Sequence, residues 1–300
     1  VDGPLDRVRR AVTENGSENA VLVRTSDHGD LLGAHGGLHQ KWFNLYDEAT
    51  RVPFVIARIG ADATAAREVT APTSHVDLVP TLLGAAGVDV AAVSETLATS
   101  FTEVHPLPGR DLMPVVNGAA AEQDRTIYLM TRDNILEGDT GASGAAQAIG
   151  ANTNPPALLR IKVPANVAAN FEGLVSRVTN AEAAGGSGHL WKLVRTFDDP
   201  ATWTEPGVRH LAANSRGGDT YRTDPLDDQW ELYDLTSDPI EAVNRWADPS
   251  LHELRRHLRT QLKLVRTASV PERNDPWPYV SRRPPEPGSA VRRLLCRFRP

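Results

Sequence analysis

One stretch of this chain constrains its fold more than any other: AVLVRTSDHGDLLGAHGGLHQKWFNLYDEATRVPF, from Ala20 to Phe54. It opens on the apolar run Ala20–Val23, which has no polar alternation. Such a run is typical of a strand buried on both faces of a parallel sheet, although four residues also fit a helix. A second strand is expected at Val52–Ala57, and a Gly- and His-rich loop followed by a helix over Lys41–Thr50 is expected between the two strands.

An acid and an imidazole, Asp27 and His28, follow the first expected strand, and Gly29 allows the backbone to turn. In open α/β sheets, ligands bind just beyond the carboxyl ends of the strands. Oxygen and nitrogen donors side by side suit a divalent metal ion, although a hard cation takes about six ligands. The alternative is a polar turn that caps the next helix, with His28 solvated.

Three further polar residues follow in the loop and at the expected helix start: His35, His39 and Lys41. Lys41 fits an exposed lysine at a helix start, and it equally fits a point charge that holds an anionic oxyacid near a metal. Each histidine is a candidate substrate contact or a solvated loop residue. The residues alone leave these alternatives open.

The order of these residues resembles a known family. The segment TSDHGDLLGAHG (Thr25–Gly36), followed by Lys41, Tyr46–Glu48 and Arg51–Pro53, is similar to the sulfatases of the alkaline-phosphatase-like superfamily, of the arylsulfatase and choline-sulfatase type. A long ordered motif of this kind is far more specific than any of its parts. The resemblance implies an α/β fold, with a parallel-rich sheet flanked by helices of which this chain holds a part.

The resemblance also implies roles for single residues. In that family an S-D-[NH]-G motif supplies two metal ligands, which correspond here to Asp27 and His28, and a following lysine, here Lys41, binds the sulfate group and takes part in catalysis. His35 and His39 remain candidate substrate contacts. Ca²⁺ is the expected metal. Because many members carry asparagine where this chain has His28, Mn²⁺ or Zn²⁺ is the alternative, as in related phosphonate monoester hydrolases.

One part of the family pattern is missing from this sequence. Sulfatases carry a nucleophilic formylglycine, made from the cysteine of C-x-P-[SA]-R, near their N-terminus, together with two metal-binding aspartates. The single cysteine here, Cys296, lies in LCRFRP and does not fit that motif. The resemblance therefore implies the C-terminal part of a sulfatase, with the nucleophile and half of the metal shell outside it.

The implied function is metal-dependent hydrolysis of the sulfate ester of a small molecule. One alternative is hydrolysis of phosphodiesters or phosphonate monoesters at the same kind of site. A second alternative is that the 300-residue chain is a catalytically inactive fragment.

Three regions are expected along the chain. Residues 1–118 resemble the end of the sulfatase catalytic core, which includes a capped helix from Ser74 to Gly87 and the segment GRDLMP. Residues 119–270 are expected to form a small α+β subdomain. Its antiparallel strands, each with one polar face, are expected at Ile127–Met130, His189–Arg195 and Gln229–Leu235, and its last helix is expected to begin at Asp248. Residues 271–300 are rich in Pro and Arg and are expected to be a disordered tail.

Charge and composition narrow the partners. The net charge of −6 and a pI of about 5.9 argue against a general nucleic-acid binder. No apolar run approaches the roughly 18 residues of a membrane span, so no membrane partner is expected. A single cysteine excludes an internal disulfide, and no signal peptide is visible at the start of the chain, which favours a cytoplasmic location without establishing it. The oligomeric state is left open.

Overall fold

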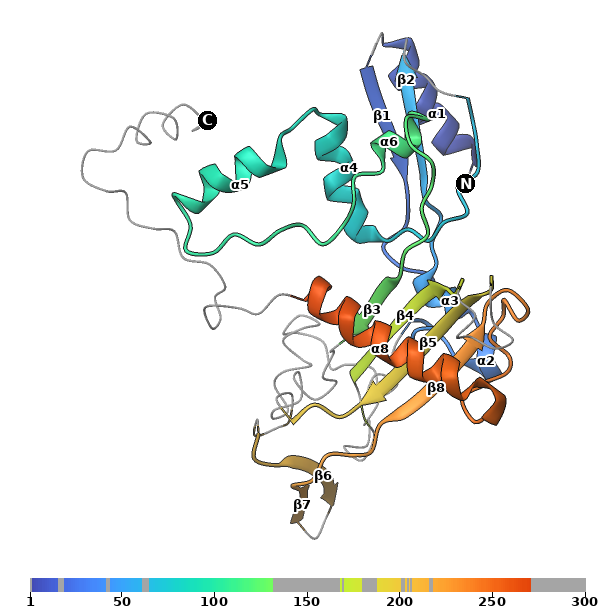
Figure 1. The fold of residues 1–300 in the computed structure, drawn as a ribbon, viewed down its shortest axis with the longest axis vertical. Helices are drawn as coiled ribbons and strands as arrows, with labels where there is room; N and C mark the ends of the chain where they lie inside the picture. Colours follow the sequence, from blue (N-terminus) through green and yellow to red (C-terminus); the bar gives the residue numbers. More distant parts are fainter. Residues whose placement is uncertain are drawn as a thin grey trace, which may run out of the picture. The chain divides into compact units, whose positions relative to one another are not determined.

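The computed structural model (Figure 1) describes residues 2–15, 19–41, 44–60, 65–131, 168, 170–179, 188–200, 203, 205, 207–215 and 218–270. These residues belong to two compact units. The first contains Val1–Arg24, Val55–Gln123 and Arg266–Pro300, and the second contains Thr25–Phe54 and Asp124–Val265. The expected tail, 271–300, and Cys296 lie outside the described residues.

The first unit begins with helix α1 (Asp2–Glu14) and a two-stranded sheet of β1 (Asn19–Arg24) and β2 (Val55–Gly60). Both strands were expected, but they pair antiparallel, from Asn19 opposite Gly60 to Arg24 opposite Val55. The inner residues of both strands are only half-buried. The apolar run at Ala20 is thus a strand, but every strand pair among the described residues is antiparallel, and the parallel arrangement is not seen there.

The other regular elements described in the first unit are helices. A short 3₁₀ turn, η1 (His75–Asp77), leads into α4 (Leu78–Ala85), as the Ser74 cap predicted. The helices α5 (Val90–Ala98) and α6 (Met113–Val116) follow. Asp77 is fully buried, and its carboxylate accepts hydrogen bonds from the backbone N–H of Ser74 at 2.9 Å and of Arg110 at 2.8 Å. One buried acid therefore ties the segment GRDLMP to the start of this helix.

No single described helix is long and apolar enough to cross a membrane. By length and composition alone, the bent pair formed by His75–Ala85 and Val90–Ala98 meets that test together, with an angle of 100° between its two parts.

The second unit is built on a four-stranded antiparallel sheet in the order β3-β4-β5-β8. Its strands are β3 (Ile127–Thr131), β4 (Asn170–Arg177), β5 (Leu190–Phe197) and β8 (Gln229–Asp234). The antiparallel sheet and three of its strands were predicted. The central strand β4 was not, and neither was the separate hairpin of β6 (His210–Ser215) and β7 (Gly218–Arg222).

One face of this sheet is covered by the last helix. The 3₁₀ turn η4 (Pro249–Leu251) begins where the Asp248 side chain accepts the N–H of Ser250 at 2.9 Å, and α8 (His252–Ser269) follows. The buried core between helix and sheet consists of Leu174, Val178, Trp191, Leu193, Leu232, Leu251, Leu254, Leu258 and Leu262. The predicted leucine stripe is thus confirmed, since leucines spaced three or four apart share one helix face.

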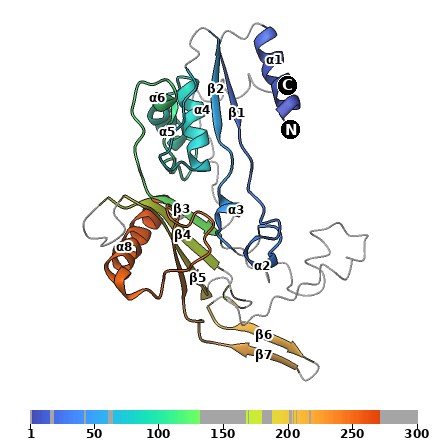
Figure 2. The ribbon, with the colours of Figure 1, turned by 90° about the vertical axis from the view of Figure 1, so that its right-hand side faces the viewer.

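The opposite face of the sheet is covered by the segment that contains α3 (Asp47–Thr50), and Figure 2 shows α3 and α8 on opposite sides of the strands. Thr25–Phe54 therefore belongs to the same compact unit as the C-terminal sheet. This differs from the expected division at residue 118, which placed the motif segment with the N-terminal region only. The fold is α/β with antiparallel sheets.

Candidate functional site

The loop that follows β1 carries the predicted acid–imidazole pair. Asp27 is exposed, and one of its oxygens, Oδ1, accepts the backbone N–H of His28 at 3.0 Å. The other oxygen, Oδ2, lies 3.2 Å from Nε2 of His28. The structure therefore places these two predicted metal ligands close together, a pair by distance but not an aligned hydrogen bond.

The other ring nitrogen of His28 fixes which tautomer this contact involves. Nδ1 lies 2.7 Å from the carbonyl oxygen of Gly29, which can only accept, so the network assigns the hydrogen to Nδ1. In a neutral ring, Nε2 is then an acceptor, 3.2 Å from Oδ2 of Asp27. Two acceptors 3.2 Å apart repel unless a cation lies between them, either a proton or a metal ion. The donor set thus fits two ligands of a divalent cation.

A hydrogen bond from the backbone and nearby positive charge lower the pKa of Asp27. The largest contribution is the hydrogen bond from the N–H of His28, and the charges of His28 and Lys41 act in the same direction, while desolvation opposes them. The loop between Asp27 and Lys41 is closed at Asp30, whose Oδ1 accepts the N–H of Leu32 at 2.9 Å and of Gln40 at 3.2 Å.

A glycine fixes this loop against α3. The N–H of Gly29 donates to the carbonyl oxygen of Ala49 at 2.9 Å. A Cβ atom at position 29 would lie 1.8 Å from the carbonyl oxygen of Glu48, so only glycine allows this approach. The positions of Asp27 and His28 are thus tied to the position of α3.

His35 lies in α2 (Ala34–Gly37), where its φ of 50° departs from helical geometry. Its ring stacks on Tyr46 with centroids 3.7 Å apart, and its Nε2 lies 3.0 Å from Oε2 of Glu48. Burial acts to raise the pKa of Glu48, but the backbone N–H of Glu48 and the His35 ring lower it more, and the net shift is downward. The structure thus gives His35 two contacts with the α3 segment, and its role as a substrate contact stays a prediction.

His39 and Lys41 are both exposed, and Lys41 lies in a bend. The helix expected over Lys41–Thr50 is wrong in length, because among the described residues of that range only Asp47–Thr50 is helical. Tyr46 is extended, with φ −63° and ψ 151°, and its N–H is bound by the Asn44 side chain at 3.1 Å. Because the backbone is extended here, the Leu45 side chain reaches the sheet and the Tyr46 ring reaches His35.

Contacts with the sheet, which sequence reasoning missed, hold α3 in place. Lys192 of β5 has no exposed surface, and its Nζ donates to the carbonyl oxygen of Leu45 at 3.0 Å and to the carboxylate of Asp47. The N–H of Asp47 donates to Oε2 of Glu241 at 2.6 Å. Oε1 of Glu241 lies 2.9 Å from Nζ of Lys192, an ion pair by distance but not an aligned hydrogen bond. Burial is the main cause that raises the pKa of Glu241, and Lys192 opposes it.

Apolar packing completes this attachment. Leu45 is buried with Phe171 and Val194. It lies over Gly173 of β4, where an added Cβ would come within 3.2 Å of the Leu45 side chain and 2.7 Å of the Leu193 carbonyl oxygen. The polar face expected for this sheet is therefore not solvated, because the α3 segment covers it. An unbroken path of contacts links the sheet, α3, Gly29 and the Asp27–His28 pair.

Among the described ranges, no group of three or more His, Cys, Asp or Glu side chains is placed to hold a metal ion. Asp27 and His28 thus provide two donors, and a full shell needs others.

Comparisons with known proteins match the region that contains this site. Residues 1–88 match the model of the Sulfatase family. An uncharacterized sulfatase, YidJ of Escherichia coli K12, is 38% identical over 89 residues, which cover 30% of this chain and 17% of that protein. Arylsulfatase K of Danio rerio is 38% identical over 110 residues, which cover 36% of this chain and 19% of that protein. The choline-sulfatase of Rhizobium meliloti is 36% identical over 104 residues, which cover 34% of this chain and 17% of that protein. The chain spans under a fifth of the length of these relatives.

Solved structures extend the likeness of the fold over more of the chain. A protein crystallised with its substrate D-glucosamine-2-N,6-O-disulfate aligns with a TM-score of 0.52 at 19% identity, over 90% of this chain and 38% of that one. The phosphonate monoester hydrolase of Agrobacterium radiobacter aligns with a TM-score of 0.50 at 21% identity, over 95% and 43%. At these identities the likeness concerns the fold. Residues 1–88 of this chain are therefore similar to the Sulfatase family model, and the likeness to the solved structures is one of fold.

Proposed function

We propose that this chain carries the metal-binding and sulfate-binding residues of one side of a sulfate ester hydrolase site. In this proposal Asp27 and His28 hold a divalent cation, most favourably Ca²⁺ with Mn²⁺ or Zn²⁺ as alternatives, and Lys41 holds the sulfate group. The substrate is the sulfate ester of a small molecule. The family match of residues 1–88 supports the reaction class.

One observation supports the metal-binding role more than any other. Oδ2 of Asp27 and Nε2 of His28 lie 3.2 Å apart, and Nδ1 of His28 is already bound to the Gly29 carbonyl. A shared cation relieves the repulsion between these two acceptors. Holding the second ring nitrogen on a backbone carbonyl is also how metal-binding histidines are commonly oriented.

Each residue then has a separate task. When bound, the cation would polarise the sulfuryl oxygens and stabilise the negative charge that grows on them. Asp27 offers an ionised carboxylate, since the neighbouring N–H and positive charges lower its pKa. Lys41, exposed at the end of the same loop, supplies a compact positive charge for a second sulfuryl oxygen. Gly29 and α3 hold the loop in place, which limits the reorganisation needed during reaction.

The nucleophile of this reaction is not assigned to any residue of the chain. The sequence C-x-P-[SA]-R does not occur in its 300 residues. We therefore expect no turnover of aryl sulfates by the 300-residue chain assayed alone with added metal. Turnover under those conditions would show that the chain contains a nucleophile and would contradict this part of the proposal.

The same donor set also suits hydrolysis of phosphodiesters or phosphonate monoesters, and the fold of a phosphonate monoester hydrolase supports this second candidate. The two reactions are separated by an activity screen on the full-length protein. p-Nitrophenyl sulfate, bis-p-nitrophenyl phosphate and p-nitrophenyl phenylphosphonate are compared, each with Ca²⁺, Mn²⁺ or Zn²⁺ and with EDTA. Preference for the sulfate, lost with EDTA, supports the proposal, and preference for either phosphorus ester overturns it.

A further inference from the structure

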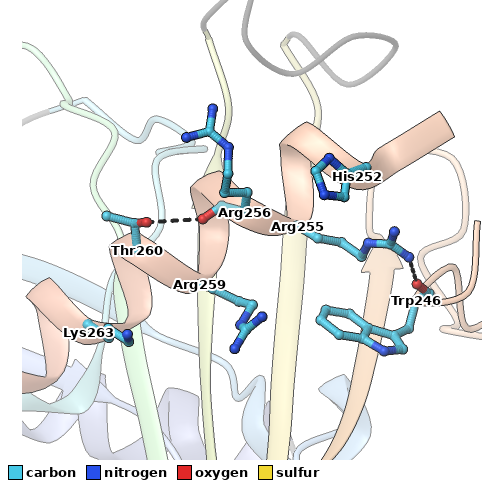
Figure 3. Close-up of a pocket in the computed structure, with 7 residues that line it drawn as sticks. All are labelled: Trp246, His252, Arg255, Arg256, Arg259, Thr260 and Lys263. Atoms are coloured by element: carbon cyan, nitrogen blue, oxygen red, sulfur yellow. Dashed lines mark hydrogen bonds between the residues drawn. The ribbon is translucent and has the colours of Figure 1, made fainter. Parts of the chain in front are cut away.

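A second candidate site lies along α8, the helix on the side of the sheet opposite α3. A pocket of about 560 Å³ is lined by Trp246, His252, Arg255, Arg256, Arg259, Thr260 and Lys263 (Figure 3). Four of these residues are Lys or Arg and none is acidic. Helix α8 as a whole carries five Lys or Arg and a single acid, Glu253. A pocket with this charge attracts anions, even though the net charge of the chain is −6.

Three of the cations form one row along the helix. Arg255, Arg259 and Lys263 are spaced four residues apart, so their side chains share one face of α8 and follow one another at about 6 Å along the axis. Such a row complements a molecule that repeats its negative charges along its length, rather than a single small anion.

Two of these arginines are held against indole rings. The guanidinium of Arg255 lies 5.2 Å from the ring centroid of Trp246 and donates to the Trp246 carbonyl oxygen. The guanidinium of Arg259 lies 5.0 Å from the ring of Trp230. The two indoles stack on each other at 5.2 Å and 14°, and both pack against the buried core of the unit. Figure 3 shows Arg255 and Arg259 on the same side of the α8 ribbon as Trp246.

This stacking prepares both arginines for binding. A long exposed side chain loses rotamer freedom when it binds a ligand, and that loss weakens binding. Arg255 and Arg259 have lost part of this freedom already, while their N–H groups can still donate in pairs to an oxyanion. Among the described residues, no carboxylate forms a salt bridge with Arg255 or Arg259. The neighbouring Arg256 differs, since its Nη2 lies 2.6 Å from Oε2 of Glu253. The pocket therefore offers positive charge at fixed positions.

We propose that Arg255, Arg259, Lys263 and Trp246 form a holding site for a sulfated oligosaccharide, separate from the Asp27 loop. The sulfate groups lie along the row of cations, in which Trp246 holds Arg255 in place. The choice of sulfate as the anionic group rests on the proposed function. Nucleic acid is the competing molecule with repeated negative charges, and the choice against it rests on the same ground.

The test is a binding measurement on the 300-residue chain in EDTA, by calorimetry at low salt. The probes are a heparin-derived hexasaccharide, the same hexasaccharide with its sulfates removed, and the single-stranded oligonucleotide dT12. We expect binding of the sulfated probe that weakens with added salt. The desulfated probe and dT12 should each bind at least tenfold more weakly.

Variants locate the site. Arg255→Gln/Arg259→Gln should weaken binding of the sulfated probe at least tenfold, and Arg259→Lys, which keeps the charge but loses the planar fork, should weaken it less. Arg9→Gln/Arg10→Gln removes the same charge from α1 and should leave binding unchanged. The melting temperature of each variant checks its folding, and the exposed Arg259→Gln alone serves if the double variant unfolds.

The results separate this proposal from the proposed function. Lys41→Ala should leave hexasaccharide binding intact, whatever it does to turnover. Loss of binding in Lys41→Ala, no effect of the Arg255 and Arg259 substitutions, or equal affinity for the desulfated probe or for dT12 would each overturn the holding site.

Discussion

Lys192 of β5, which has no exposed surface, forms an ion pair with the half-buried Asp47 of α3, which lies 145 positions earlier in the chain. This pair joins the C-terminal sheet to the segment that carries Asp27, His28 and Lys41. Because Gly29 is in turn hydrogen-bonded to the end of α3, the geometry of the candidate site depends on a cation in a strand remote in sequence.

We predict that Lys192→Met destabilises the protein by about 3–5 kcal/mol, because Asp47 and Glu241 are left without their buried cation. Denaturant unfolding at pH 7 measures the change. The exposed Lys263 provides the matched control, and Lys263→Met should change the free energy of unfolding by less than about 0.5 kcal/mol. A loss under about 1 kcal/mol for Lys192→Met would show that the ion pair does not hold the two segments together.

The close approach of Gly29 to α3 gives a second prediction. Gly29→Ala places a Cβ 1.8 Å from the Glu48 carbonyl oxygen, so the loop and α3 must separate, at a cost of about 1–3 kcal/mol. Gly3→Ala is the control, since no atom lies within 4 Å of its added Cβ, and it should be neutral or slightly stabilising. The melting temperatures of the two variants measure this difference. Equal melting temperatures for Gly29→Ala and Gly3→Ala would contradict the close packing of Gly29 on α3.

A third prediction concerns pH. Burial is the main cause that raises the pKa of Glu231, whose Oε2 accepts the Tyr233 hydroxyl at 3.1 Å. A carboxyl whose pKa is higher in the folded state stabilises the fold below its unfolded pKa, and that contribution is lost as pH rises through the folded value. Glu231→Gln keeps an acceptor for Tyr233 and removes the titration. Urea unfolding gives the free energy of unfolding of both proteins at each pH. The value for the variant minus the value for wild type should increase between pH 4 and pH 8, and a difference that does not change with pH would contradict this.

The fourth prediction tests the proposed sulfate contact. In the full-length protein, Lys41→Ala should lower kcat/KM for p-nitrophenyl sulfate at least tenfold, because a charge that acts on the sulfuryl oxygens in the transition state is lost. Arg10→Ala, on the exposed surface of α1, should behave like wild type. Turnover by Lys41→Ala at the wild-type rate would rule out the role given to this lysine.

Local patterns in the sequence predicted much of the fold. Leucines repeating every three or four residues from Leu251 gave α8, and alternation around Trp191 and Leu232 gave two strands of the sheet. The motif TSDHG also predicted that Asp27 and His28 lie side by side. Each of these patterns is complete within a few residues of the chain.

Other features could not be predicted because they depend on contacts between distant segments. Alternation placed Lys192 on a polar face of β5, but nothing local indicated that α3 would cover that face and bury the charge. Strand β4 was not predicted because it contains a charged residue, Glu172, and a glycine, Gly173. In the structure the buried Glu172 pairs with Arg195, with Oε1 2.8 Å from Nη1, and Gly173 leaves room for Leu45. The apolar run at Ala20 indicated a parallel strand, whereas its partner β2 runs antiparallel to it.

The most direct test of the site is a crystal structure of the full-length protein soaked with Mn²⁺ and sulfate, with the metal located by its anomalous signal. We predict a Mn²⁺ ion bound jointly by the Asp27 carboxylate and Nε2 of His28, with a sulfate ion bridging it to Nζ of Lys41. A metal bound without either residue, or a Lys41 amine more than about 10 Å from the Asp27 carboxylate, beyond one Debye length at 0.1 M salt, would contradict the account.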